Sequence, residues 1–251
     1  MNSRVRQGLT IVLVLATIVV NVLANSLPLN GLNTGEISDR FEIFFVPAGY
    51  VFSIWGLIYL GLIGFAIYQA LPAQKDDPLQ KAIAPGVWLG SAANIAWIFF
   101  WHYEMFALTL PAMLILLASL LYVFTRISAA RSSLDKAGRW LVEAVFAVYL
   151  GWISVATVAN VTQVLFFFGW GGWGISDEVW AVIMTAVATI LGILMLWRER
   201  SVPYALVLIW AFIGIALKHG GLVGTAAYTG SAVLAVVSAV VLFTKPKTSG
   251  V

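Results

Sequence analysis

Three stretches of the sequence combine aromatic and amide side chains at helical spacing. In VYLGWISVATVANVTQ, residues 148–163, the side chains of Tyr149, Trp152, Ala156 and Asn160 recur three or four residues apart. Residues at this spacing lie along one face of an α-helix. That face carries a phenol, an indole, a methyl-sized gap and a carboxamide. Such a set suits a flat, largely apolar ligand with a few polar edges.

The other two stretches offer similar faces. SAANIAWIFFW places Asn94 and Trp97 on one stripe, and FSIWGLIY places Trp55 and Tyr59 on another. An unpaired amide in hydrocarbon costs several kcal/mol, so these faces must turn toward other helices or toward a cavity. Two roles fit them: the lining of a ligand pocket, or membrane anchoring by the aromatic rings with interhelical hydrogen bonds from the amides. The residues by themselves leave both roles open.

The composition indicates that membrane-spanning elements position these faces. Of the 251 residues, 61% are hydrophobic and only 10% are charged, whereas a soluble domain has about a quarter of its residues charged. Lipid must therefore cover the apolar surface, and we expect an integral membrane protein. The absence of cysteine excludes disulfides, thiolate metal sites and a cysteine nucleophile. The basic residues form no dense patch, so we expect no nucleic-acid partner.

Runs of about 20 apolar residues predict eight membrane-spanning helices. Their continuity, rather than period-two alternation, predicts an all-α polytopic bundle and not a barrel. The runs cover residues 9–27, 48–71, 84–102, 106–126, 139–168, 178–197, 202–218 and 228–244.

The distribution of charge predicts the orientation of these spans. With the N-terminus in the cytoplasm, all 14 lysines and arginines except Arg40 and Lys218 fall at cytoplasmic ends, among them Lys245 and Lys247. This is the positive-inside bias. We therefore expect both termini in the cytoplasm, in the cytoplasmic membrane of a bacterium. A helical rise of 1.5 Å per residue then places the three stripes about 10–12 Å deep in the outer half of the membrane.

The three stretches resemble the TspO/MBR family, the tryptophan-rich sensory proteins related to the translocator protein and peripheral benzodiazepine receptor. The second span has the family's proline, tryptophan and tyrosine at its spacing, the third span has N-x-x-W, and the fifth has Y-x-x-W-x-x-x-A-x-x-x-N. The matching residues are Pro47, Trp55 and Tyr59, then Asn94 and Trp97, and then Tyr149, Trp152, Ala156 and Asn160. The resemblance covers about residues 5–170.

The resemblance implies a five-helix membrane domain over residues 1–170, with residues 171–251 forming three additional spans. It implies a pocket for porphyrins, other tetrapyrroles or sterols, under the first loop. The ligand-binding residues would be Trp55, Tyr59, Asn94, Trp97, Tyr149, Trp152, Ala156 and Asn160. One of the family's paired prolines is replaced by Val46, and the first span lacks G-x-x-x-G. A homodimer is therefore left open.

These observations favour a binding or sensory membrane protein whose partners are the bilayer and a small hydrophobic ligand. A transporter of such molecules and a light-dependent porphyrin-degrading protein are the alternatives. The sequence indicates no catalytic residue and no metal site, and no cofactor is required beyond a porphyrin- or haem-type ligand. We expect His102 and His219 at the membrane interface, and Glu143 in a local pair with Arg139 one turn away.

Overall fold

The computed structural model describes residues 2–27 and 29–244. Within that part of the chain, eight helices are long and apolar enough to cross a membrane, which confirms the all-α polytopic bundle. Lys245 and Lys247, which the orientation argument used, lie outside the described residues. The eight helical spans are α1 (Ser3–Ser26), a 3-10 turn with α3 (Gly49–Ser53 and Ile54–Ala70), α4 (Pro78–His102), α5 (Phe106–Ala129), α6 with a π-helical turn and α7 (Lys136–Gly138, Arg139–Ala144 and Val145–Phe167), α8 (Asp177–Glu199), α9 (Val202–His219) and α10 (Gly221–Phe243).

Several helices begin before the apolar runs that predicted them. The α4 helix starts at Pro78 rather than at residue 84, because the Asp77 side chain accepts a hydrogen bond from the backbone N–H of Gln80 and caps the first turn. Proline suits the first helical position, where no N–H is needed. The α10 helix starts at Gly221 rather than at residue 228. Hydropathy detects the most apolar part of a helix and misses first turns that are polar, as in α4, or rich in glycine, as in α10.

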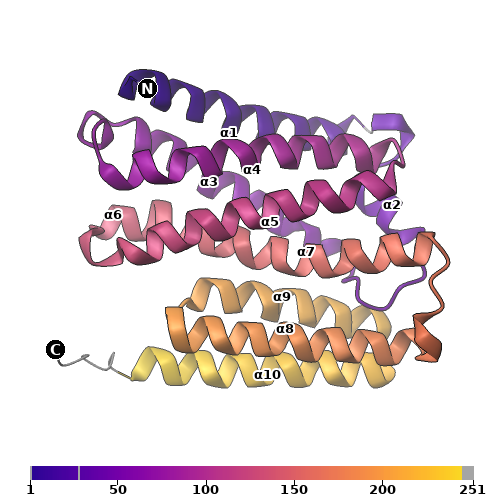
Figure 1. Cartoon of the computed structure of the whole chain (residues 1–251). Helices are drawn as coiled ribbons and strands as arrows, with labels where there is room; N and C mark the ends of the chain where they lie inside the picture. The colour runs from indigo at the N-terminus through magenta and orange to yellow at the C-terminus, as the bar shows by residue number, and fades with distance from the viewer. Residues whose placement is uncertain (1, 28, 245–251) are drawn as a thin grey trace.

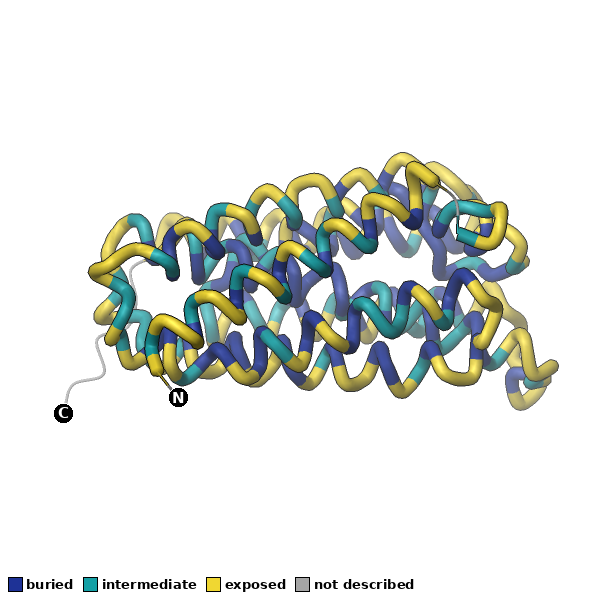
Figure 2. The backbone as a smooth tube through the Cα atoms, turned by 90° about the horizontal axis from the view of Figure 1, so that it is seen from above, coloured by how far each residue is buried: buried dark blue, intermediate teal, exposed yellow. Residues whose placement is uncertain are grey.

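The helices form two groups. The helices α1, α3, α4, α5 and α7 pack around one another, and α8, α9 and α10 lie against them as a further layer, joined mainly through α7 and α9 (Figure 1). Buried positions face the space between helices, whereas exposed positions face outward along the whole bundle (Figure 2). Many of the outward side chains are apolar: Leu60 is 70% exposed, Val236 64% and Leu217 61%. In water this surface would be unfavourable, and lipid accounts for it.

The two ends of the bundle differ. The first loop, residues 27–48, carries the short helix α2 (Thr34–Asp39) and covers one end, which we call the loop end. The start of α1 and the end of α10 are both at the opposite end, on different sides of the bundle, and we call this end the terminal end (Figure 1). This arrangement follows from an even number of spans.

At the terminal end, the expected partner of Glu143 is wrong. Glu143 forms an ion pair with Arg131, with 2.6 Å between Oε1 and Nε, and not with Arg139. Arg139 and Glu143 belong to a π-helical turn, in which hydrogen bonds span five residues instead of four, so the i,i+4 spacing of an α-helix does not apply. Arg131 also donates to the carbonyl of Glu199, which ties α8 to the end of α5.

Candidate ligand site

Four of the sequence-predicted aromatic residues meet in one cluster near the loop end. The indole of Trp55 stacks on the ring of Tyr59, with centroids 5.5 Å apart. Its other contacts are edge-to-face, with Tyr149 at 5.9 Å and Trp152 at 6.2 Å. These separations and angles are the ones that aromatic pairs prefer. The stripes of α3 and α7 therefore face each other across the bundle.

The amide of Asn94 lies in a buried chain of hydrogen bonds between three helices. Its Oδ1 accepts from Nδ2 of Asn21 on α1 at 2.6 Å, and its Nδ2 donates to the hydroxyl of Tyr149 on α7 at 3.0 Å. All three side chains are at most 5% exposed. Both ends of the Asn94 amide thus have protein partners.

Asn160 is bound in a similar way. Its Oδ1 accepts from the indole N–H of Trp97 at 3.4 Å, and its Nδ2 donates to Thr109 of α5 at 2.9 Å. This polar chain joins α4, α5 and α7. Buried polar groups that are satisfied across helices fix how those helices pack.

A cleft of about 580 Å³ opens beneath the first loop, between α1 and α3. We call it the first-loop cleft. One wall is aromatic, with Phe52, Trp55 and Tyr59, and the opposite wall carries Asn21 and Asn25 of α1. Its volume lies within the range of about 300–1,000 Å³ that small-molecule sites span.

A much smaller cavity, of about 50 Å³, lies deeper between α4, α7 and the first loop. We call it the inner cavity. Four of the sequence-predicted residues line it: Trp97, Trp152, Ala156 and Asn160. The indole N–H of Trp152 is buried and has no hydrogen-bond partner in the described part of the chain.

Only two residues, Phe52 and Thr34, line both the first-loop cleft and the inner cavity. The ring of Phe52 packs edge-to-face on Trp152, with centroids 5.7 Å apart. A rotation of the Phe52 side chain would therefore change the wall between the two spaces. Of the eight sequence-predicted residues, Trp55 and Tyr59 line the cleft and four line the inner cavity, whereas Asn94 and Tyr149 line neither space.

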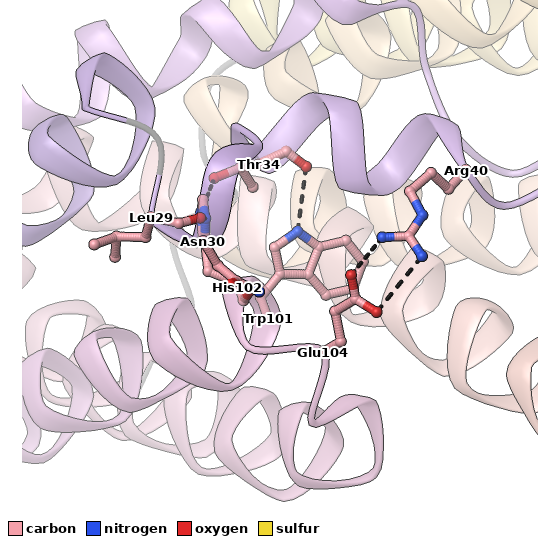
Figure 3. Close-up of polar contacts among 7 residues, drawn as sticks. All are labelled: Leu29, Asn30, Thr34, Arg40, Trp101, His102 and Glu104. Carbon is pink, nitrogen blue, oxygen red and sulfur yellow. Dashed lines mark hydrogen bonds and ion pairs between the residues drawn. The ribbon is translucent and has the colours of Figure 1, made fainter.

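The helix α2 is held over this region by hydrogen bonds to α4 and α7. Gln163, the second amide of the α7 stretch, donates to the Ser38 hydroxyl at 3.0 Å. The indole of Trp101 donates to the Thr34 carbonyl at 3.2 Å, as Figure 3 shows. His102 lies beside Trp101 and contacts the same segment, with Nε2 3.0 Å from the Thr34 hydroxyl and Nδ1 3.1 Å from the Leu29 carbonyl (Figure 3). Since a carbonyl only accepts, Nδ1 carries a proton.

His102 is the last residue of α4, at the loop end, where its ring is only 1% exposed and belongs to the attachment of the first loop. Two ion pairs at the surface extend this attachment, from Arg40 to Glu104 and from Asp39 to Lys218. The hydrogen bond from Arg40 to Glu104 raises the pKa of the guanidinium above its usual range (Figure 3).

Sequence reasoning missed the partners of the two amides. Asn21 lies in the first apolar run, and the rule that singled out Asn94 and Asn160 applies equally to it. Thr109 carried no comparable signal, since a threonine hydroxyl is usually satisfied by its own helix. Asn21 lines the first-loop cleft, so it belongs to the candidate site.

Two other hollows follow the seam between the helix groups, one of about 330 Å³ beside α7 and α8 and one of about 870 Å³ beside α3, α7 and α9. Their linings are largely apolar. The two hydroxyl side chains in the smaller hollow, Thr157 and Thr162, donate to carbonyls of their own helix. With few polar groups to orient a ligand, both resemble surfaces that contact lipid chains.

The family comparison agrees with the motifs and the fold. The family model of TSPO-like proteins matches residues 7–241. The chain belongs to the TSPO-like family. The match continues past residue 170 and includes α8, α9 and most of α10 of this TSPO-like protein. No curated protein and no solved structure matches the chain.

Family membership and the eight apolar helices make this TSPO-like protein a multi-pass integral membrane protein. Among the described residues, no group of three or more His, Asp or Glu side chains could hold a metal ion. The candidate site therefore offers aromatic faces, amides and hydroxyls.

Proposed function

We propose that this TSPO-like protein is a binding or sensory membrane protein for a planar, largely apolar ligand, namely a porphyrin, another tetrapyrrole or a sterol. The ligand lies in the first-loop cleft, with its flat face against Trp55 and Tyr59. One edge reaches the inner cavity. The family resemblance supports the ligand class, and the aromatic wall beside amide groups supports the location.

The unpaired indole N–H of Trp152 carries this proposal. A buried donor without an acceptor costs about 1–3 kcal/mol, so such groups are rare unless something else satisfies them. The inner cavity beside Trp152 is too small for a polycyclic ligand but has room for the edge of one. Displacement of the Phe52 ring would let that edge enter from the first-loop cleft and place an acceptor against the N–H.

A titration with protoporphyrin IX tests the proposal. The detergent-purified protein should show saturable quenching of tryptophan fluorescence. Ala156 lines the inner cavity between Trp152 and Asn160, so Ala156→Phe fills the space that the ligand edge would occupy. We expect the affinity to fall at least about tenfold, or about 1.4 kcal/mol.

Ala118→Phe is the matched control, because Ala118 is exposed on α5 and the same change there adds a ring on the lipid side. Both variants should be measured on the monodisperse, folded fraction, since overpacking at Ala156 costs about 1–3 kcal/mol of stability. Binding by Ala156→Phe that equals binding by Ala118→Phe would place the ligand elsewhere. The hollows beside α7 and α9 would then be the next candidates.

We also propose that the terminal end faces the cytoplasm, on the basis of the positive-inside bias. Reporter fusions or cysteine labelling should place residues near 36 and 175 outside and residues near 77 and 133 inside. The reverse pattern would put the first-loop cleft on the cytoplasmic side and contradict the orientation.

A further inference from the structure

The rim of the first-loop cleft is acidic. Its charged lining consists of Glu36 and Asp39 on α2, and none of the basic side chains that the structure describes lines it. Asp39 pairs with Lys218, with 2.7 Å between Oδ1 and Nζ, so its charge is largely neutralised. Glu36 forms no ion pair with any described residue and is exposed. The cleft thus has one uncompensated carboxylate at its rim.

The loop end as a whole is also acidic, which reinforces the negative charge at the rim of the cleft. It carries six acidic and two basic side chains, a formal net charge of −4 with both histidines neutral. They are Glu36, Asp39, Glu42, Glu104, Asp177, Glu178, Arg40 and Lys218. The summed field of such a face changes the local concentration and approach of charged ligands. A molecule that enters the cleft from this end meets a negative potential.

We propose that the first-loop cleft selects planar ligands whose polar edge is neutral or cationic, such as hydroxylated or amine-bearing polycycles, over ligands that carry carboxylates. This inference rests on the proposed function and specifies its ligand class. The carboxylate of Glu36 repels an anionic edge at the rim. The amides of Asn21 and Asn25 opposite the aromatic wall add neutral polar contacts.

Glu36 can be neutralised without disturbing the helix that carries it. Its Oε2 accepts from the backbone N–H of Asn33 at 2.7 Å, and the Asn33 side chain accepts from the backbone N–H of Glu36 in return. Glutamine serves in this capping box as well as glutamate. Glu36→Gln therefore removes the charge and keeps α2 in place.

Three forms of one ring provide the probes: protoporphyrin IX with two propionates, its neutral dimethyl ester, and the bis-amide with ethylenediamine, which is cationic. Their affinities are measured by fluorescence quenching at low ionic strength in a neutral detergent. Each probe partitions differently into micelles. The informative quantity is the ratio of affinities between Glu36→Gln and the unaltered protein for each probe, in which micelle partitioning cancels.

Glu178→Gln is the matched control, because Glu178 belongs to the same acidic face but does not line the cleft. We expect Glu36→Gln to strengthen binding of the dicarboxylate about three- to tenfold, to leave the ester within about twofold and to weaken the cationic amide, as expected for a charge at an interface rim. Glu178→Gln should change each affinity less than about twofold. All differences should shrink in 1 M salt, where the Debye length is about 3 Å.

Equal changes for the three probes, or no change for any of them, would overturn this inference while leaving the proposed function intact. A larger effect of Glu178→Gln than of Glu36→Gln would also overturn it, because the selection would then belong to the whole face and not to the cleft. Failure of all three probes to give saturable quenching would overturn the proposed function itself.

Discussion

The buried asparagines of α1, α4 and α7 bond from one helix to another, whereas the threonine hydroxyls of α8 and α10 donate to carbonyls of their own helices. Asn21, Asn94 and Tyr149 connect α1, α4 and α7. In α8, the hydroxyl of Thr185 donates to the Ala181 carbonyl one turn back. The helices α8–α10 are held instead by close packing: a Cβ added at Gly230 would lie 2.7 Å from Thr189 Oγ1 and 3.0 Å from the Phe212 ring.

This difference suggests a division of structural roles. Directional bonds hold helices at fixed separations, which is what a bundle with an internal cavity requires. Small residues let backbones approach and leave no internal space. Of the described residues, those that line the first-loop cleft and the inner cavity belong to the first loop, the 3-10 turn before α3, and α1, α3, α4 and α7. We infer that the α8–α10 layer supports the ligand-binding part from the side.

The largest effect should follow from breaking the chain of bonds between helices. Asn94→Leu leaves the Tyr149 hydroxyl and one N–H of Asn21 buried without their partner. At about 1–3 kcal/mol for each unsatisfied group, we expect a loss of about 2–4 kcal/mol in the free energy of unfolding. Unfolding in a mixed micelle of increasing SDS fraction measures this loss.

Thr185→Val is the comparison within α8, because it removes a buried hydroxyl of which the only partner is a carbonyl of its own helix. It should change the unfolding free energy by less than about 0.5 kcal/mol, since that bond slightly opposes helix geometry. Equal losses for Asn94→Leu and Thr185→Val would show that the contrast between the two regions does not exist.

A somewhat smaller effect should follow from overpacking the second region. Gly230→Leu forces the Phe212 ring and the Thr189 side chain to move, at a cost of about 1–3 kcal/mol. The affinity of the folded fraction for protoporphyrin IX should stay unchanged, because Gly230 lines neither the cleft nor the inner cavity. The unfolding free energy and the quenching titration are measured on the same sample.

Gly8→Leu on α1 is the matched control, since a Cβ there meets nothing within 4 Å. This change should be neutral or slightly stabilising, because leucine favours helix more than glycine does. A loss of porphyrin affinity in folded Gly230→Leu would mean that α8–α10 takes part in binding and does more than support the site.

The sequence was sufficient for the fold because the bilayer imposes a simple rule. A helix that crosses lipid must be apolar over about 20 residues, and eight such runs are visible. The start of α4 was misplaced because its cap and first turn are polar, and the start of α10 because glycines at 221 and 224 and Thr225 lower the hydropathy of its first turns. Glu143 was assigned the wrong partner because its helix contains a π-helical turn that hydropathy does not reveal.

For the candidate site, helical periodicity predicts which residues share a face but not what that face meets. The stripe of Tyr149, Trp152 and Asn160 follows from spacing alone. That Asn21 and Thr109 would bond to the amides depends on which helices become neighbours, and this is a property of the packed bundle. The same holds for Trp152, which alone among the sequence-predicted site residues has a buried polar atom without a partner.

The smallest expected effect concerns that indole. Trp152→Phe keeps a ring but removes an N–H that has no partner, so it removes an energetic penalty while leaving a small void. These terms oppose each other, and we expect the unfolding free energy of the ligand-free protein to change by less than about 1 kcal/mol.

Trp101→Phe is the matched comparison, because Trp101 is equally buried but donates to the Thr34 carbonyl at 3.2 Å. That change removes the bond from the indole to the Thr34 carbonyl and loosens the first loop, so it should cost about 1–3 kcal/mol more than Trp152→Phe. Trp152→Phe should also weaken the binding of protoporphyrin IX about threefold, because it removes one modest hydrogen bond between the indole N–H and the ligand. If Trp152→Phe destabilised the ligand-free protein as much as Trp101→Phe, the Trp152 N–H would already have an acceptor, and the proposed function would lose the unpaired donor that carries it.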